Sequence, residues 1–280
     1  MSSGGRQRRF ALIVPDGYDG TTPLPLVLGL HALTVPYQTV PALTGFADMG
    51  PFHDFIGVTP SGLVDGVTPY WLAAPVADSY DVEFIADLLD LLEAELCVDS
   101  TRVFSTGMSN GGQMTSLLAC RLAHRVTAAA PVAGVEFHDG CEGRPVPVMA
   151  FHGTADPIVT YDGEGLDATR IADLQYWKGE VPHGLPAHRG VDAAMQAWAA
   201  HNRCAAEPEE ERISPSVRRK TWRDCEADTV LYVIDGGGHM WPGKPVPAFE
   251  ATFGPGTTEI DASRLAFDFF FSQPSIVSTD

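Results

Sequence analysis

The sequence predicts an α/β fold in which a mostly parallel central sheet is covered by helices on both faces. Segments with the apolar content of strands alternate along the chain with segments of helical periodicity. The strand segments lack the polar alternation of half-exposed strands, as in "LPLVLGLHA" at 24–32. The 280 residues can bury one large core, so we expect a single domain over 1–280.

Each expected element is defined by its own pattern. Strands are expected at 9–15, 24–32, 54–62, 101–105, 126–134, 146–153 and 229–238. Helices are expected at 81–96, 111–123, 190–202 and 261–271. The helix at 81–96 is the clearest, because its apolar residues fall on one stripe and acidic residues occupy much of the other face. The segment 161–190 is rich in glycine and charge and has weak periodicity, so we expect an insertion over one end of the sheet.

The charge balance limits the partners. Lys and Arg number 18 and Asp and Glu number 36, which gives a net charge of −18. A surface this acidic disfavours nucleic acid and anionic membranes. No stretch approaches the roughly 18 consecutive apolar residues of a membrane span, so membrane insertion is not expected. The composition leaves the oligomeric state open.

Residues 105–112, "STGMSNGG", place one serine between glycines. Gly107, Ser109 and Gly111 fit the pattern G-x-S-x-G, with a strand pattern before it and a helix pattern after it. This context indicates a nucleophile elbow. The glycines are needed because the tight turn strains the serine backbone and brings neighbouring chains close. Ser109 is therefore the candidate nucleophile.

A serine hydroxyl needs a base to take its proton, and the base needs a group that orients it. His239, in "YVIDGGGHMWPG", follows a strong strand, where an α/β sheet places its site. Asp156 follows the strand at 146–153 and is the candidate orienting group. The chain order serine, aspartate, histidine is that of α/β-hydrolases. His31 and His152 also follow apolar runs, and we expect both to bond backbone groups at strand ends.

Six segments carry a family resemblance over nearly the whole chain: "PLVLGLHA", "YDVEFIADLLD", "CVDSTRVFSTGMSNGGQM", "APVAG", "RPVPVMAFHGTADPIV" and "YVIDGGGHMWPG". With them the chain resembles the esterase family of polyhydroxybutyrate depolymerases and feruloyl esterases. The resemblance implies an α/β-hydrolase fold, hydrolysis through an acyl-enzyme, and no cofactor. The catalytic residues of the family fall on Ser109, Asp156 and His239. Ala32 departs from the family, which usually has glycine after the early histidine.

The expected mechanism assigns further residues. The oxyanion of the tetrahedral intermediate is expected to accept the N–H of Asn110 and, from the 32–34 loop, the N–H of Leu33. Trp241 lies beside His239 in the sequence, and Tyr70 and Trp71 form an aromatic pair in an early loop. These three residues are candidates for the substrate cleft, although packing in the core is as good an explanation of Trp71.

The expected function is a serine carboxylic-ester hydrolase. Its substrates would be short-acyl, hydroxyalkanoate, or feruloyl and other aromatic esters, either small molecules or polymers. The alternatives are a serine peptidase on the same fold, an acetylxylan-type carbohydrate deacetylase, and a binding protein that kept the fold without catalysis.

Five cysteines bear on structure and location. Cys204 and Cys225 flank a charge-rich segment that lacks apolar anchors, and we predict a disulfide between them. The pairing of Cys97, Cys120 and Cys141 stays open, and no spacing of Cys and His suggests a zinc site or another metal. A disulfide favours a secreted protein whose signal peptide is absent from this sequence, with a cytoplasmic location as the alternative.

Overall fold

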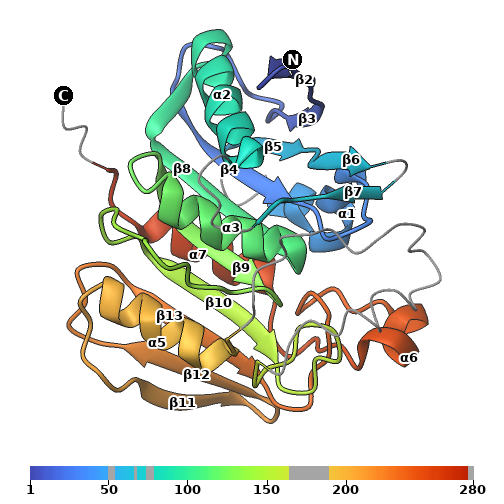
Figure 1. Cartoon of the computed structure of the whole chain (residues 1–280), viewed down its shortest axis with the longest axis vertical. Coiled ribbons are helices and arrows are strands. Elements are labelled where there is room, and N and C mark those ends of the chain that lie inside the picture. The colour runs from blue at the N-terminus through green and yellow to red at the C-terminus, as the bar shows by residue number, and fades with distance from the viewer. Residues whose placement is uncertain (50–53, 66–67, 74–78, 164–188, 277–280) are drawn as a thin grey trace.

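A nine-stranded sheet forms the centre of the computed structural model, which describes residues 1–49, 54–65, 68–73, 79–163 and 189–276 (Figure 1). Its strand order is β11-β12-β13-β10-β9-β8-β4-β5-β3. The strands from β13 to β5 run parallel, while β3, β12 and β11 are antiparallel to their neighbours. The bounds are β3 (Phe10–Ile13), β4 (Leu24–Leu30), β5 (Ile56–Pro60), β8 (Val98–Met108), β9 (Val126–Val132), β10 (Val148–Gly153), β11 (Glu209–Ser214), β12 (Val217–Trp222) and β13 (Thr229–Ile234).

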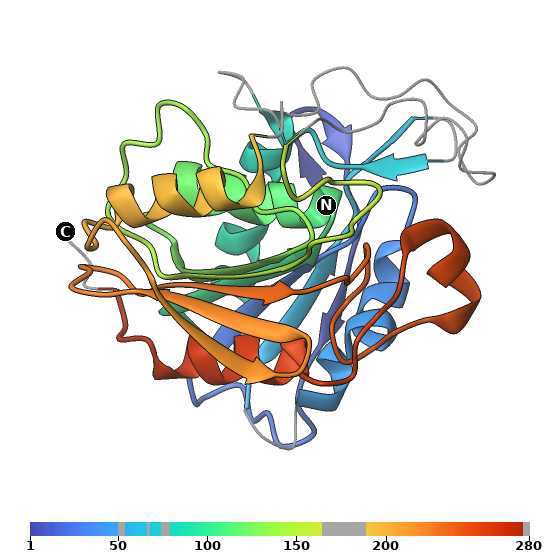
Figure 2. The same ribbon diagram turned by 90° about the horizontal axis from the view of Figure 1, so that it is seen from below.

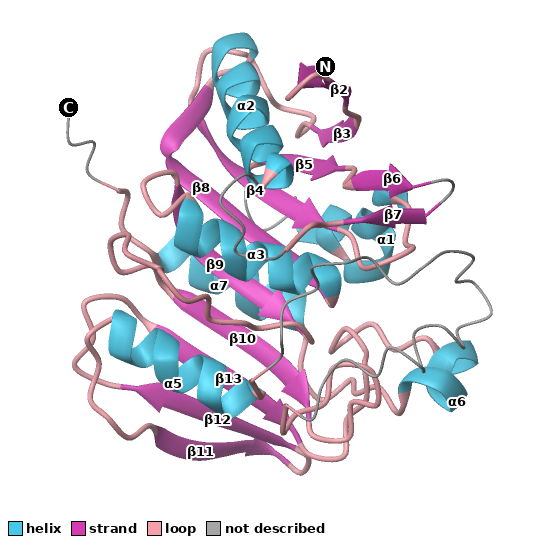
Figure 3. Cartoon of the chain, viewed as in Figure 1, coloured by secondary structure: helices cyan, strands magenta, loops and turns pink. Residues whose placement is uncertain are grey.

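Helices cover both faces of this sheet. Seen edge-on in Figure 2, α2, α3 and α5 lie on one side and α1 and α7 on the other. The bounds are α1 (Val40–Thr44), α2 (Tyr80–Glu95), α3 (Asn110–Arg121), α5 (Val191–His201), α6 (Glu250–Phe253) and α7 (Ala262–Ser272), with short 3-10 segments η1 (Tyr37–Thr39), η2 (Phe46–Met49) and η3 (Pro247–Phe249). Figure 3 shows the alternation of strand and helix, and two small hairpins beside the sheet, β1 (Ser2–Ser3) with β2 (Arg6–Gln7) and β6 (Leu63–Asp65) with β7 (Thr68–Tyr70).

Apolar side chains fill the space on both faces of the sheet. On the α7 face, Phe104 of β8 stacks on Phe270 with ring centroids 5.0 Å apart, inside a larger cluster of buried aromatic residues. On the other face, Leu28 and Leu117 belong to the cluster beneath α2 and α3, and Trp198 of α5 to the next one. Burial on two faces explains why the strands read as continuous apolar runs. The predicted α/β architecture is therefore confirmed.

The segment between Cys204 and Cys225 differs from expectation. It has few apolar residues, yet it forms the hairpin of β11 and β12 at the edge of the sheet. Opposite charges face each other across it, as in the ion pairs of Arg218 with Glu210 and Arg219 with Glu211. Such cross-strand pairs favour pairing of the strands, although each exposed pair contributes only about 0.2–1 kcal/mol.

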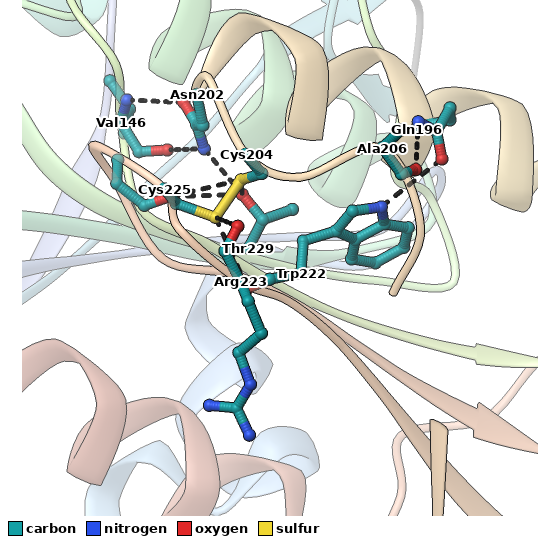
Figure 4. Close-up of a disulfide and its surroundings, with 10 residues drawn as sticks. Val146, Gln196, Asn202, Cys204, Ala206, Trp222, Arg223, Cys225 and Thr229 are labelled. Carbon is teal, nitrogen blue, oxygen red and sulfur yellow. Dashed lines mark hydrogen bonds between the residues drawn. A yellow bond between two sulfur atoms is a disulfide. The ribbon is translucent and has the colours of Figure 1, made fainter. Parts of the chain in front are cut away.

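Two disulfides are present in the described part of the chain. The predicted Cys204–Cys225 bond is confirmed and closes the base of the hairpin (Figure 4). Beside it, Asn202 fixes the chain by pairing through its side-chain amide with the backbone N–H and C=O of Val146. A second disulfide joins Cys120 of α3 to Cys141, and Cys97 is free.

Two further expectations concern the insertion at 161–190 and membrane insertion. The insertion expected at 161–190 lies almost entirely outside them. Across the helices that are described, none combines the length and the apolar composition that crossing a bilayer requires.

Candidate active site

Ser109 occupies a strained turn between β8 and α3. Its backbone torsion angles are φ 56° and ψ −122°, and a positive φ is disfavoured for any residue with a Cβ atom. Its N–H donates to the Val132 carbonyl at 2.9 Å, and its own carbonyl accepts the N–H of Gln113 at 2.9 Å. A Cβ atom on Gly107 or Gly111 would collide with backbone atoms of neighbouring segments. The strained turn that the G-x-S-x-G pattern predicts is therefore present.

Asp156 and His239 lie together at the carboxyl ends of two neighbouring strands. Asp156 follows β10 and His239 follows β13, and these strands pair in parallel up to Gly153 and Ile234. Asp156 Oδ2 lies 2.7 Å from His239 Nδ1. Because Nδ1 faces a carboxylate, it carries the proton and donates, which leaves Nε2 as the basic nitrogen.

The Asp156 carboxylate is buried, and several hydrogen-bond donors of the protein surround it. Its Oδ1 accepts the backbone N–H groups of Ile158 at 2.8 Å and Val159 at 2.9 Å. Burial by itself raises the pKa of Asp156, but attraction to the His239 charge and hydrogen bonds from His152 and His239 hold that pKa well below its usual value. The carboxylate therefore stays ionised throughout the neutral and mildly acidic range.

His152 also reaches Asp156, a contact that the sequence did not predict. Its Nε2 lies 2.8 Å from the Val159 carbonyl oxygen, so the expected bond to the backbone is confirmed. The same nitrogen lies 3.3 Å from Asp156 Oδ2. The four-residue spacing in "HGTAD" is the signal that could have shown it, because a tight turn after β10 folds Asp156 back toward the strand.

The two expected oxyanion donors come from adjoining segments. Asn110 is the first residue of α3, and an N–H at a helix start has no acceptor within the helix. Leu33 lies in a turn closed by the hydrogen bond from Val35 N–H to Ala32 O, where Thr34 N–H is engaged by Pro69 O. Among the described residues, no hydrogen bond uses the Leu33 N–H. The Leu33 side chain packs against Ile158 and Val159, beside Asp156.

Trp71 holds these segments together, and its assignment to the substrate cleft is wrong. The side chain is fully buried, and its indole N–H donates to the His31 carbonyl at 3.0 Å. The Asn110 side chain accepts the Trp71 backbone N–H at 2.7 Å and donates to the Trp71 carbonyl at 3.0 Å. The indole is therefore enclosed, and no face of it is available to a substrate.

His31 completes this bridge from the other side. Its Nε2 accepts the Gly62 N–H at 2.9 Å, and its Nδ1 lies 2.8 Å from the Ala32 carbonyl. The expected backbone bonding of His31 is thereby confirmed. Burial lowers the pKa of His31 to about 4, so the ring is neutral at pH 7 and can accept this hydrogen bond.

Trp241 is also buried rather than in a cleft. It is 4% exposed, belongs to the core cluster that contains Phe267 of α7, and donates its indole N–H to Ser263 Oγ at 3.0 Å. The chain turns inward directly after His239, so neighbours in sequence point to different surroundings. Tyr70 is half-buried at the end of β7, and its role at the cleft stays a prediction.

The sequence did not indicate Phe253, which lies beside His239, or Phe249, which contacts Phe253. The ring of Phe253 lies 6.0 Å from the His239 ring, and its carbonyl accepts the His239 backbone N–H. Phe249 meets Phe253 edge-on at 6.0 Å and is 40% exposed. Phe253 also packs against the cluster of Ile158 and Val159, as Leu33 does. No sequence signal marks this segment, since it is a short helical turn in a proline-containing loop.

Within the described residues, no group of three or more His, Cys, Asp and Glu side chains is placed to hold a metal ion.

Comparison with known proteins bears on this site. No family model matches the chain. Feruloyl esterase B from Piromyces equi is 28% identical over 249 residues, which are 83% of this chain and 42% of that protein. A probable feruloyl esterase C from Aspergillus niger is 31% identical over 164 residues, 56% of this chain and 57% of that protein. The chain thus spans about half the length of these feruloyl esterases.

Two further comparisons extend over most of the chain. The putative esterase NocK from Nocardia uniformis subsp. tsuyamanensis is 29% identical over 259 residues, 88% of this chain and 73% of that protein. Among solved structures, the acetyl xylan esterase from Aspergillus awamori superposes with a TM-score of 0.60 at 17% identity, covering 86% of this chain and 91% of that one. The chain therefore has the α/β-hydrolase fold, and its sequence resembles those of feruloyl esterases.

Proposed function

We propose that the protein is a serine carboxylic-ester hydrolase, with Ser109 as nucleophile, His239 as general base and Asp156 as the residue that orients His239. The observation that carries this proposal is the 2.7 Å contact between Asp156 Oδ2 and His239 Nδ1. It fixes the tautomer that a base needs, at the same end of the parallel sheet as the strained Ser109 turn. The sequence resemblance to feruloyl esterases supports the same reaction class.

The residues act in sequence in the proposed mechanism. Ser109 Oγ attacks the ester carbonyl carbon while His239 Nε2 takes its proton, and Asp156 stabilises the resulting imidazolium. The oxyanion accepts the N–H groups of Asn110 and Leu33, and each such donor typically contributes about 3 kcal/mol to the transition state. His239 then returns the proton to the departing alcohol. A water molecule, activated by His239 in the same way, hydrolyses the acyl-enzyme.

The proposed substrates are compact esters, with small aromatic acyl groups and short acyl groups foremost. Support comes from apolar side chains near the Asp156–His239 pair. Leu33 and Phe253 pack on the Asp156 turn, and Phe249, in contact with Phe253, presents an exposed aromatic face. Flat apolar faces favour aromatic or compact groups over long, flexible chains. Hydroxyalkanoate esters fit the same description and remain within the proposal.

The proposed location is extracellular. Two disulfides, Cys120–Cys141 and Cys204–Cys225, form and persist in oxidising compartments and are rare in the cytosol of mesophiles.

Active-site labelling tests the proposed function. A fluorophosphonate should modify Ser109, and Ser109→Ala should abolish labelling and reduce kcat/KM on p-nitrophenyl acetate by more than about 1,000-fold. Ser105→Ala is the matched control, because Ser105 is a buried serine of β8, four residues before Ser109, whose hydroxyl contacts Thr115 instead. The control should keep both labelling and turnover. Labelling of another residue, or turnover by Ser109→Ala at the wild-type rate, would overturn the assignment.

A further inference from the structure

Two histidines contact the same oxygen of one buried carboxylate. His239 Nδ1 and His152 Nε2 lie 2.7 Å and 3.3 Å from Asp156 Oδ2. We propose that His152 is a positioning residue that tunes the basicity of His239 through Asp156. This inference rests on the proposed function only in naming His239 as the base.

The geometry fixes which His152 nitrogen carries a proton. Nε2 faces two acceptors, the Val159 carbonyl at 2.8 Å and the Asp156 carboxylate at 3.3 Å. A ring nitrogen between two acceptors must donate, so Nε2 is protonated and its hydrogen is shared between them, mainly toward Val159. The Nε2–H of His152 thus points toward the Asp156 carboxylate as well as the Val159 carbonyl.

The same contacts close the turn that carries Asp156. The Val159 N–H donates to Asp156 Oδ1 at 2.9 Å, while the Val159 carbonyl accepts from His152. His152 therefore holds both ends of the 156–159 turn from the strand side. The side chains of His152 and Asp156 are both 0% exposed, so water does not compete for these bonds.

The other charged groups near this cluster interact with partners of their own or are exposed. His152 and His239 are therefore the main side-chain partners of Asp156. From α5, Asp192 is one step removed, because it accepts from Tyr161, whose ring meets the His152 ring edge-on at 6.0 Å. Asp192 is also paired with Lys220 of β12 at the surface. Directly after β13 the neighbouring carboxylate is Asp235, which pairs with Arg218 of β12 and Arg212 of β11. From α6, the contact with His239 is the uncharged ring of Phe253, and Glu250 at the start of that helix is exposed.

Two donors on one oxygen share its negative charge. Removing the His152 donor concentrates the charge on the side that faces His239 and stabilises the imidazolium form of His239. His239 then loses its proton at higher pH. Since the base acts only when deprotonated, the acid limb of the kcat/KM profile should move to higher pH.

His152→Leu and His152→Gln test the proposal. Leucine fills the buried space without a donor, whereas the glutamine side-chain amide can donate from about the position of Nε2. Histidine-selective carbon NMR would follow the titration of the His239 ring, and the pH dependence of kcat/KM on p-nitrophenyl acetate would follow activity. We expect His152→Leu to move both midpoints up by about 0.5–1 pH unit. We expect His152→Gln to reverse most of that shift and to leave KM unchanged.

His138→Leu is the matched control, because His138 is another buried histidine and lies outside this cluster. It should leave both midpoints in place. Should His152→Leu not fold, His152→Asn serves instead, since the shorter side chain keeps a polar group but its amide falls short of Asp156. Unchanged midpoints in the folded donor-less variant would overturn the proposal. The NMR midpoint does not depend on turnover, so a wild-type protein without esterase activity would refute the proposed function alone.

Discussion

The side-chain amide of Asn110 and the backbone of Trp71 form a pair of hydrogen bonds, of 2.7 Å and 3.0 Å, between the start of α3 and the chain that follows β7. The Trp71 indole continues this link to the carbonyl of His31, at the start of the loop that contains Leu33. Asn110 thereby offers its backbone N–H to the proposed oxyanion site. Its side chain, through Trp71, also links its own segment to the loop that contains the second proposed donor, Leu33.

Asn110→Ala separates these two roles, because it keeps the backbone N–H and removes only the two side-chain hydrogen bonds to Trp71, here called the brace. We expect kcat on p-nitrophenyl acetate to fall by about 10-fold or more, since small displacements of positioned groups are costly in catalysis. KM should change little, because the acyl and alcohol contacts remain. Steady-state kinetics with a thermal melt measures both effects. A folded variant with wild-type kcat would show that the brace does not position the oxyanion donors.

Asp156→Asn removes the charge that holds His239 while keeping the size of the side chain. The asparagine amide can present a donor to Nδ1, which favours the wrong tautomer of the base. By analogy with the same change in serine proteases, we expect kcat to fall by about 10,000-fold. The pKa of Asp156 lies well below its usual value, so the carboxylate stays ionised between pH 5 and 7. Wild-type activity should therefore show no loss from protonation of Asp156 in this range. Retention of more than a tenth of the rate by the variant would contradict the role of Asp156.

Phe249→Ala tests the exposed aromatic face beside Phe253. It should raise KM for methyl ferulate several-fold and leave KM for p-nitrophenyl acetate unchanged, because only the aromatic acyl group loses a stacking partner. Ile213→Ala is the control, as an equally exposed apolar residue on the β11 edge strand. Equal KM changes on the two substrates would remove Phe249 from the binding surface.

Trp241 should behave as a core residue. Trp241→Ala should lower the free energy of unfolding by about 3–5 kcal/mol, the usual cost of truncating a buried tryptophan. Denaturant melts measure this cost. Loss of affinity for aromatic esters without loss of stability would mean that the indole contacts substrate after all.

The buried His31 predicts a pH dependence of stability. Its folded pKa of about 4 lies below the value of about 6.5 expected in the unfolded chain. Between these two values the unfolded state binds the extra proton, so the free energy of unfolding falls as pH decreases from 6.5 to 4. His31→Gln should flatten part of that slope, because a glutamine side chain does not titrate. The fold should be kept, since the amide oxygen can still accept the Gly62 N–H. An identical slope in the variant, measured by denaturant melts across this range, would contradict it.

The sequence predicted best where one local pattern specifies one local structure. The glycines around Ser109 and the apolar runs of β4, β8 and β10 reflect constraints within a few residues, and these elements are found where expected. The loop positions of Asp156 and His239 followed from strand order alone, because parallel strands bring their carboxyl ends to one edge.

The sequence predictions failed where contacts between distant segments determine the position of a residue. Whether Trp71 and Trp241 face solvent or core depends on segments far away in sequence, namely Asn110 and α7. The hairpin of β11 and β12 was missed because its stabilising pattern consists of opposite charges across two strands rather than apolar residues along one. The contact of His152 with Asp156 depends on a tight turn after β10 that folds Asp156 back toward the strand, and only the four-residue spacing of the two residues points to it.

Trapping the acyl-enzyme tests whether Ser109 is the nucleophile. The protein would be mixed with p-nitrophenyl acetate, quenched in acid within the first turnovers, digested, and mapped by mass spectrometry. We expect an acetyl group on Ser109 in the wild type, and on no residue in Ser109→Ala. An acetyl group on a different side chain, or wild-type turnover that never passes through acetylated Ser109, would contradict this expectation.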